Sequence, residues 1–204
     1  FSRITKSRYS LTEVLKEYRD FVMRENVRLN SVLVDAFLRS LNGVIARYQN
    51  DLVLSLENHE EAVEILKSQG ASDQLTREYH FMSRSLYQMG DYQNSVNYID
   101  SAISLAHQLQ NEYYRMALMN NRTFLLFKLQ SYSQAKETLR EIIRYHQDRD
   151  EWYDAAICCE NMSLIFDKEE DLNDSALYFG RLAYTLSTMD NDALTRISSS
   201  IYLT

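Results

Sequence analysis

Apolar residues recur every three or four positions along most of the chain, which is the spacing of one buried face of an α-helix. The first stripe consists of Leu11, Val14, Leu15, Tyr18 and Val22. Ser10 and Glu13 have the Ser-x-x-Glu spacing that satisfies free backbone N–H groups at the start of a helix. We therefore expect a helix that begins near Ser10 and buries this apolar face.

The next stripe is longer, and its members are Leu33, Val34, Phe37, Leu38, Leu41, Ile45, Tyr48 and Leu52. Spacings of three and four residues predict helix throughout this part of the chain. Glycine weakens a helix, so the stripe fits either one long helix or two helices with a break near Gly43.

From about residue 59 the pattern repeats itself. Three segments, each a turn followed by the start of a helix, begin at positions 90, 130 and 170. They are Gly90–Val96, Gln130–Lys136 and Glu170–Ala176, and a degenerate copy is His59–Val63. A constant period of this length, about 40 residues, is typical of solenoids built from helix pairs.

The best copy of the repeat resembles the tetratricopeptide repeat. Its first helix carries Tyr79, Met82, Ser83 and Leu86, the turn is Gly90-Asp91-Tyr92, and the second helix carries Ser95, Ile99, Ala102 and Ile103. The chain departs from the family in its longer period, where about 34 residues is usual, and in lacking the first-helix tryptophan and the closing proline. The resemblance covers roughly residues 40–204. It implies an all-α, antiparallel helix-pair solenoid that forms a right-handed superhelix of about nine or ten helices without strands.

This register divides the chain into two parts. We expect residues 1–40 to form N-terminal helices that pack on the solenoid, and residues 41–204 to form the repeats. The repeats are expected at about 41–70, 74–110, 112–148 and 151–189, with a partial repeat from 191. Because the chain begins at Phe1 and stops within a first-helix pattern, we expect it to be a fragment or a processed product.

Composition agrees with helix and excludes several classes of ligand. Proline is absent and glycine occurs only four times, so little interrupts helices. The net charge of −7 disfavours direct binding of nucleic acid. The longest apolar runs, such as Leu52–Leu54 and Phe124–Phe127, are too short to insert into a membrane. Two adjacent cysteines, Cys158 and Cys159, are expected to be free thiols, which fits the cytoplasm best, with the periplasm as the alternative.

Signatures of catalysis and of metal or cofactor binding are missing. No two histidines lie one helical turn apart, and His59-Glu60 lacks a second histidine at residue 63. The acid-rich stretches Glu57–Glu64 and Asp167–Asp174 lack the alternating ligands and central glycine of a calcium loop. We expect Cys159 to pack in the core and Cys158 to face elsewhere. The prediction is therefore no enzyme, no metal and no cofactor.

The resemblance further implies a concave groove lined by the first helices of successive repeats. The residues that its register places there are His80, Arg84, Tyr87, Asn120, Asn121, Phe124, Phe127, Lys128, Glu160, Asn161 and Leu164. Amide, aromatic and charged side chains of both signs suit a short extended peptide better than a uniformly charged polymer.

Asn121 and Asn161 occupy the same position in consecutive repeats, and family members that hold peptides often use an asparagine at this place. An amide both donates and accepts, so it can pair with a peptide unit. Phe124 and Phe127 would add apolar contact, and Arg84 and Lys128 would select an acidic group.

Three functions remain open at this point. The leading one is a non-catalytic module that binds a protein or a short peptide in the groove. The first alternative is a sensory or regulatory segment of a larger bacterial signalling or transcription regulator. The second is a phosphatase-type regulator of the Rap kind.

Overall fold

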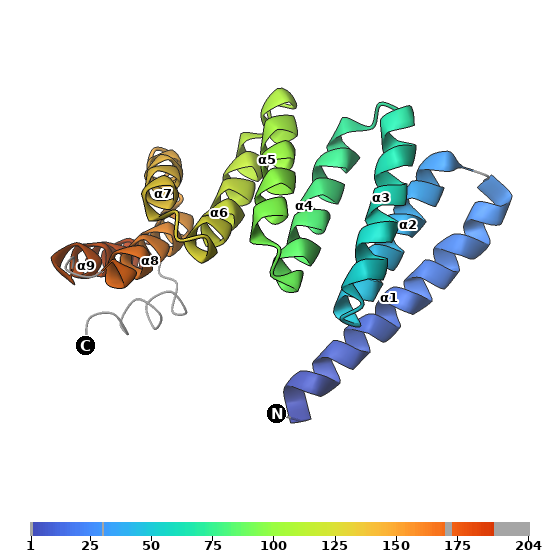
Figure 1. The fold of residues 1–204 in the computed structure, drawn as a ribbon, viewed down its shortest axis with the longest axis horizontal. Helices are drawn as coiled ribbons and strands as arrows, with labels where there is room; N and C mark the ends of the chain where they lie inside the picture. The colour runs from blue at the N-terminus through green and yellow to red at the C-terminus, as the bar shows by residue number, and fades with distance from the viewer. Residues whose placement is uncertain (1, 30, 170–172, 190–204) are drawn as a thin grey trace. The chain divides into compact units, whose positions relative to one another are not determined.

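A computed structural model describes residues 2–29, 31–169 and 173–189, and these residues form nine α-helices and no strand (Figure 1). The helices are α1 (Ser2–Leu29), α2 (Val32–Tyr48), α3 (Leu52–Ser68), α4 (Ser72–Met89), α5 (Tyr92–Gln108), α6 (Glu112–Lys128), α7 (Tyr132–Gln147), α8 (Trp152–Lys168) and α9 (Asn173–Met189). Consecutive helices within each unit pack together, as in α2 with α3, α4 with α5, and α8 with α9. The all-α, helix-pair architecture predicted from the repeat is confirmed. The proposed partial repeat from 191 lies outside the described residues.

The same turn joins successive helices at regular intervals along the chain. A residue with positive φ occurs at each of Asn50, Gly70, Gly90, Gln110, Gln130 and Asp150. The backbone N–H of the residue after it donates to the carbonyl five positions back, for example from Asp51 to Ala46 at 2.9 Å and from Ser131 to Leu126 at 2.8 Å. This hydrogen bond and the left-handed residue define a Schellman motif, which satisfies the carbonyl groups at a helix end.

Two aspartates help to start the helices that follow these turns. The side chain of Asp51 accepts a hydrogen bond from the Leu54 backbone N–H at 3.1 Å, and Asp91 accepts one from Asn94 at 3.2 Å. Each thereby satisfies an N–H group that the first helical turn leaves unpaired. Turn and cap together stop one helix and begin the next with little chain between them.

One expectation about helix ends was wrong, and one open alternative is now decided. α1 begins at Ser2, so Ser10 lies within the helix instead of at its start. α2 runs through Gly43 without a break, and the chain turns at residues 49–51. Gly43 is needed for packing: a Cβ atom there would lie 2.6 Å from Nε2 of the buried His59 on α3.

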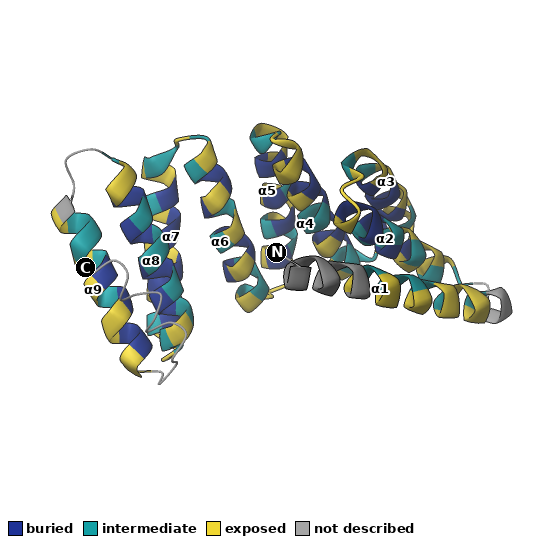
Figure 2. Ribbon diagram, turned by 90° about the horizontal axis from the view of Figure 1, so that it is seen from below, coloured by how far each residue is buried: buried dark blue, intermediate teal, exposed yellow. Residues whose placement is uncertain are grey.

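The apolar stripe of α1 is also less buried than predicted. No residue from 11 to 26 is buried, as Figure 2 shows for this helix. Leu11, Val14 and Tyr18 have exposed fractions of 41%, 59% and 50%, while Leu15 and Val22 are half-buried. Within the described residues α1 packs mainly on α2. One neighbouring helix is not enough to bury the apolar face of α1.

The chain forms two compact units, residues 1–115 and 116–204. In the first unit, a core cluster joins α2, α3 and α4 through Ala36, Val63, Leu66, Leu75 and Met82. In the second, small side chains that allow close helix packing are fully buried, and these are Ala135, Ala155, Ala156, Cys159 and Ala183. Small residues at the helix crossings are what the repeat pattern predicted.

Candidate partner-binding surface

The first unit contains a pocket of about 360 Å³ between α2 and α4, the first helices of two consecutive pairs. Its walls are mostly apolar, with Leu33, Phe37 and Val44 from α2 and Phe81 from α4. Leu66 of α3 also lines it. The volume suits one or two apolar side chains of a ligand.

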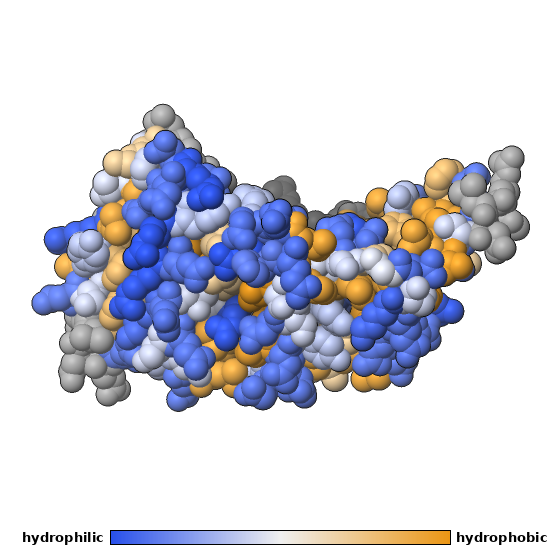
Figure 3. All heavy atoms as spheres, turned by 90° about the horizontal axis from the view of Figure 1, so that it is seen from above, coloured by the Kyte–Doolittle hydropathy of each residue, from blue (hydrophilic) through white to orange (hydrophobic). Residues whose placement is uncertain are grey.

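The pocket continues into an exposed apolar surface. Leu33 and Phe37 have exposed fractions of 46% and 44%, and the Phe37 ring packs edge to face on Tyr18 of α1 with centroids 6.2 Å apart. Figure 3 shows hydrophobic atoms gathered at the end of the first unit where α1 meets α2. Apolar surface of this extent beside a pocket is a candidate binding surface.

A buried polar pair lies beneath the pocket. Glu78 lines it, and its Oε2 accepts a hydrogen bond of 2.7 Å from Nδ1 of His59, which is fully buried. The His59 ring stacks on Phe81 with centroids 5.3 Å apart. Because the Glu78 carboxylate is hydrogen-bonded to His59, the pocket interior is apolar even though Glu78 forms part of its wall.

Basic side chains gather at the end of the pocket that faces the C-termini of α2 and α4. Arg47 and Arg84 follow the pocket residues Val44 and Phe81 by one helical turn. His80 lies close enough to both arginines to respond to them: burial, then Arg84, then Arg47 lower its pKa to about 4. This end of the surface is therefore positively charged at neutral pH.

The three sequence-predicted site residues of the first unit all lie on α4. His80 is half-buried, and its Nδ1 is 3.2 Å from the Tyr114 hydroxyl. Arg84 is exposed, and Tyr87 is 37% exposed with its ring against Tyr92 at 5.6 Å.

The other predicted residues lie on α6 and α8 of the second unit. Nδ2 of Asn161 donates to Oδ1 of Asn120 at 3.2 Å, so the structure brings these two together. Phe127 packs on Tyr132 at 5.7 Å, as Tyr87 does on Tyr92 one repeat earlier. The remaining residues are exposed, namely Asn121, Phe124 and Lys128, or half-buried, namely Glu160 and Leu164.

The sequence analysis did not predict the pocket, because the first groove residue that it assigned, His80, lies on α4 and it assigned none on α2. Phe37 and Val44 precede Arg77 and Arg84 by one period of the repeat, so the same register extends back to α2. The uncertain helix break near Gly43 concealed that relation. Applying the period to residues 32–48 would have found these residues.

The cysteines of α8 are buried thiols. Cys158 and Cys159 have exposed fractions of 2% and 0%, so the expectation that Cys158 faces elsewhere was wrong. Burial raises the pKa of each thiol to about 12. A thiol with such a pKa stays protonated at neutral pH and is a poor nucleophile.

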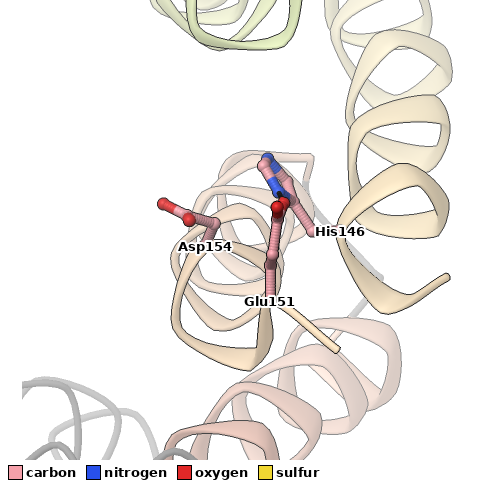
Figure 4. Close-up of side chains that lie close together, drawn as sticks. All are labelled: His146, Glu151 and Asp154. Carbon is pink, nitrogen blue, oxygen red and sulfur yellow. Dashed lines mark hydrogen bonds and ion pairs between the residues drawn. The ribbon is translucent and has the colours of Figure 1, made fainter. Parts of the chain in front are cut away.

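One cluster of metal-ligand residue types occurs where α7 meets α8. The ligand atoms of His146, Glu151 and Asp154 lie within 4.8 Å of one another. Nδ1 of His146 donates to Oε2 of Glu151 at 2.6 Å, and the Asp154 carboxylate points away from this pair (Figure 4). Sequence spacing along one helix could not reveal the cluster, because a turn separates His146 from the other two.

Comparison with known proteins supports the repeat assignment. The family model described as tetratricopeptide repeat matches residues 79–108. A search of curated protein sequences finds no match. None of the described helices is long and apolar enough to cross a membrane.

Solved structures with a similar fold include the following three. The apo form of RapI has 12% identity and a TM-score of 0.79 over 95% of this chain, which spans 54% of the RapI chain. A signal transduction ATPase (STAND) protein with a tetratricopeptide repeat sensor from Pyrococcus horikoshii has 13% identity and a TM-score of 0.71, covering 96% of this chain and 34% of that one. The Rap conjugation gene regulator of plasmid pLS20, in complex with the Phr* peptide, has 13% identity and a TM-score of 0.62. The match covers 84% of this chain and 52% of the regulator chain. The resemblance to tetratricopeptide repeat proteins is confirmed.

Proposed function

We propose that this tetratricopeptide-like chain is a non-catalytic module that binds a protein or short peptide through the α2–α4 face of its first unit. The observation that carries the proposal is the apolar pocket of about 360 Å³ with Leu33 and Phe37 exposed beside it. Complete burial of an apolar side chain of this size contributes about 1.5–3 kcal/mol, and because Leu33 and Phe37 are somewhat less than half exposed, covering each contributes about 1 kcal/mol to binding.

The chemistry of the described residues supports binding over catalysis. The two thiols are buried and protonated, and the carboxylate in the pocket is held by His59. Helical repeats of this kind generally serve as interaction surfaces. The partner sits on that surface without being chemically changed.

A regulatory role within a longer protein is the second candidate. The pLS20 Rap regulator was solved with a peptide, and the Pyrococcus horikoshii protein carries its repeats as a sensor. This chain spans only about half of the Rap chains and a third of the STAND protein. A peptide-sensing segment of a bacterial signalling or transcription regulator, Rap-like or otherwise, is consistent with both comparisons.

The test is a selection of ligands from a phage-displayed library of random linear peptides. Enriched peptides are then titrated against the wild type, Phe37→Glu and the control Val53→Glu, which changes an exposed residue of α3. We expect Phe37→Glu to weaken binding by about tenfold or more, because it places a charge beside the pocket, and Val53→Glu to leave it unchanged. Failure to enrich any peptide, or equal binding to both variants, refutes the proposal.

A further inference from the structure

Two helix junctions of the chain carry a histidine that faces a glutamate. His107 and Glu112 lie at the α5–α6 junction, with Nδ1 of the histidine 3.5 Å from Oε1 of the glutamate. His146 and Glu151 lie one repeat later, at the α7–α8 junction, with Nδ1 2.6 Å from Oε2. The second histidine is buried, whereas the first is exposed. The two pairs occupy equivalent places in the repeat, so their differences show what is particular to the second.

The residue one helical turn after the glutamate differs between the two junctions. At the first it is Arg115, whose Nε donates to Oε2 of Glu112 at 2.7 Å. At the second it is Asp154, so a second carboxylate stands where the earlier repeat has a cation. No lysine or arginine among the described residues forms an ion pair with Glu151 or Asp154. The second junction therefore lacks the basic side chain that compensates Glu112 at the first.

The turn itself leaves these ligand groups free to face one another. Arg149 precedes Glu151 but is held elsewhere, with its guanidinium carbon 3.7 Å from the centroid of the Tyr145 ring and Nη1 donating to the Tyr145 carbonyl at 3.2 Å. Glu151 occupies the N-cap position of α8, yet its side chain makes no capping hydrogen bond and reaches back to His146 of α7 instead. Both carboxylate and imidazole are therefore available to a third group.

A divalent metal ion fits between these groups after small side-chain movements. Zinc binds an imidazole nitrogen at about 2.0–2.1 Å and a carboxylate oxygen at about 2.0–2.2 Å, so two ligand atoms of a tetrahedral site lie about 3.3 Å apart. Nδ1 of His146 and Oε2 of Glu151 need to separate by less than about 1 Å, with the metal in place of the proton that they share. The ligand atom of Asp154 lies within 4.8 Å of both, and because its carboxylate points away from the pair in Figure 4, it must turn inward by about 1.5 Å.

We propose that His146, Glu151 and Asp154 form a binding site for a divalent transition-metal ion of the zinc type, with water in the fourth position. One imidazole and two carboxylates suit such an ion better than Mg²⁺ or Ca²⁺, which prefer oxygen ligands alone. The bound ion joins the last turn of α7 to the first turn of α8 and stabilises the second unit.

This site departs from the sequence-based expectation of no metal. That expectation considered histidines one turn apart on a single helix, whereas these ligands come from two helices. The site belongs to the second unit and does not rest on the proposed function, which concerns the first.

Isothermal titration calorimetry of the chain without an affinity tag measures Zn²⁺ binding directly. The wild type is compared with His146→Gln, Asp154→Asn and Asp154→Arg, the last of which copies the earlier junction. Asp154→Asn should leave the fold intact, because the Asp154 side chain forms no hydrogen bond or ion pair with another described residue. His107→Gln, at the equivalent place one repeat earlier, is the matched control.

We expect the wild type to bind Zn²⁺ at micromolar concentrations, and Mg²⁺ and Ca²⁺ at least about tenfold more weakly. His146→Gln and Asp154→Asn should each weaken Zn²⁺ binding by about tenfold or more, Asp154→Arg should abolish it, and His107→Gln should leave it unchanged. In nitrogen-15 NMR spectra, the ring resonances of His146 should shift on addition of Zn²⁺ and those of His107 should not. Thermal melting of each variant without metal reports any loss of fold.

The metal site is refuted if the wild type binds no Zn²⁺ below millimolar concentrations. Equal affinity of the wild type and Asp154→Asn would also overturn it, because the third ligand would then contribute nothing. If Ca²⁺ binds as tightly as Zn²⁺, the carboxylates attract cations without selecting a transition metal, which contradicts the proposal. A loss of affinity in His107→Gln equal to that in His146→Gln would place the ion elsewhere.

Discussion

Replacement of Gly43 by alanine tests how closely α2 and α3 pack. Alanine in an exposed helical position stabilises by about 1 kcal/mol relative to glycine. Here the added Cβ would lie 2.6 Å from Nε2 of His59 and 2.8 Å from two of its ring carbons. We therefore expect the opposite sign, with Gly43→Ala less stable than the wild type.

The magnitude follows from what holds His59 in place. The ring is fully buried, and it must move by roughly 1 Å to reach ordinary contact with a Cβ atom. That movement weakens the 2.7 Å hydrogen bond to Glu78 and leaves a buried carboxylate poorly paired. Overpacking and the weakened hydrogen bond each cost about 1–3 kcal/mol. After subtraction of the gain in helix propensity, we expect a net loss of about 3 kcal/mol.

The measurement is urea unfolding followed by circular dichroism, which gives the free energy of unfolding of each variant. Ser104→Gly and Ser104→Ala, at an exposed position of α5, measure the contribution of helix propensity alone. Introducing Gly43→Ala into a His59→Ala background removes the ring that clashes. In that background the glycine substitution should be neutral or stabilising.

An equal loss of stability from Gly43→Ala in both backgrounds would show that the ring is not the cause. A gain of about 1 kcal/mol in the wild-type background would show that α2 and α3 are not in close contact at this position.

Three more predictions concern titration, turn geometry and the asparagine pair. His80 has a pKa of about 4 in the folded chain against about 6.5 when unfolded, so the free energy of unfolding should fall by up to about 3 kcal/mol as the pH drops from 6.5 to 4. Denaturant titrations of wild type and His80→Gln across this range should show that the variant loses less. Gln130→Gly should raise the free energy of unfolding by about 1 kcal/mol because glycine adopts its φ of 57° without strain, and a lower melting temperature would contradict this. Asn161→Ala removes the hydrogen bond to Asn120 and should cost about 1 kcal/mol in unfolding experiments, and an unchanged free energy of unfolding would contradict this.

Periodicity predicted the helices well because it reflects the packing of each helix on its neighbours. The repeat period located α4 to α8, and the small residues Ser83 and Ser95 meet at a helix crossing, with their hydroxyl oxygens 2.9 Å apart. Glycine was a poorer guide. The chain turns at Asn50, which has no glycine beside it, and continues straight through Gly43, whose role is close packing.

Burial and long-range pairing could not be predicted from periodicity. The α1 stripe shows that a helix has an apolar face, but it does not say whether another helix covers it, and Tyr18 is half exposed. The His59–Glu78 pair joins residues 19 positions apart on different helices, so no local spacing indicates it. The positive end of the pocket likewise depends on Arg47, which sequence analysis did not consider and whose burial only the fold reveals.

The turn that recurs after helix upon helix has a consequence for how such a chain can change in length. The six junctions that follow α2 to α7 lie both within and between helix pairs and share one backbone geometry, so any of these six can accept the helix that normally follows another. Gain or loss of a single helix with its turn would keep the geometry of these six junctions, but it would turn the later helices of the same unit to the opposite face. Duplication or deletion of a complete helix pair preserves both the junctions and the orientation of every helix. Lengthening of the binding surface during evolution, or in protein design, is therefore expected to proceed in steps of two helices.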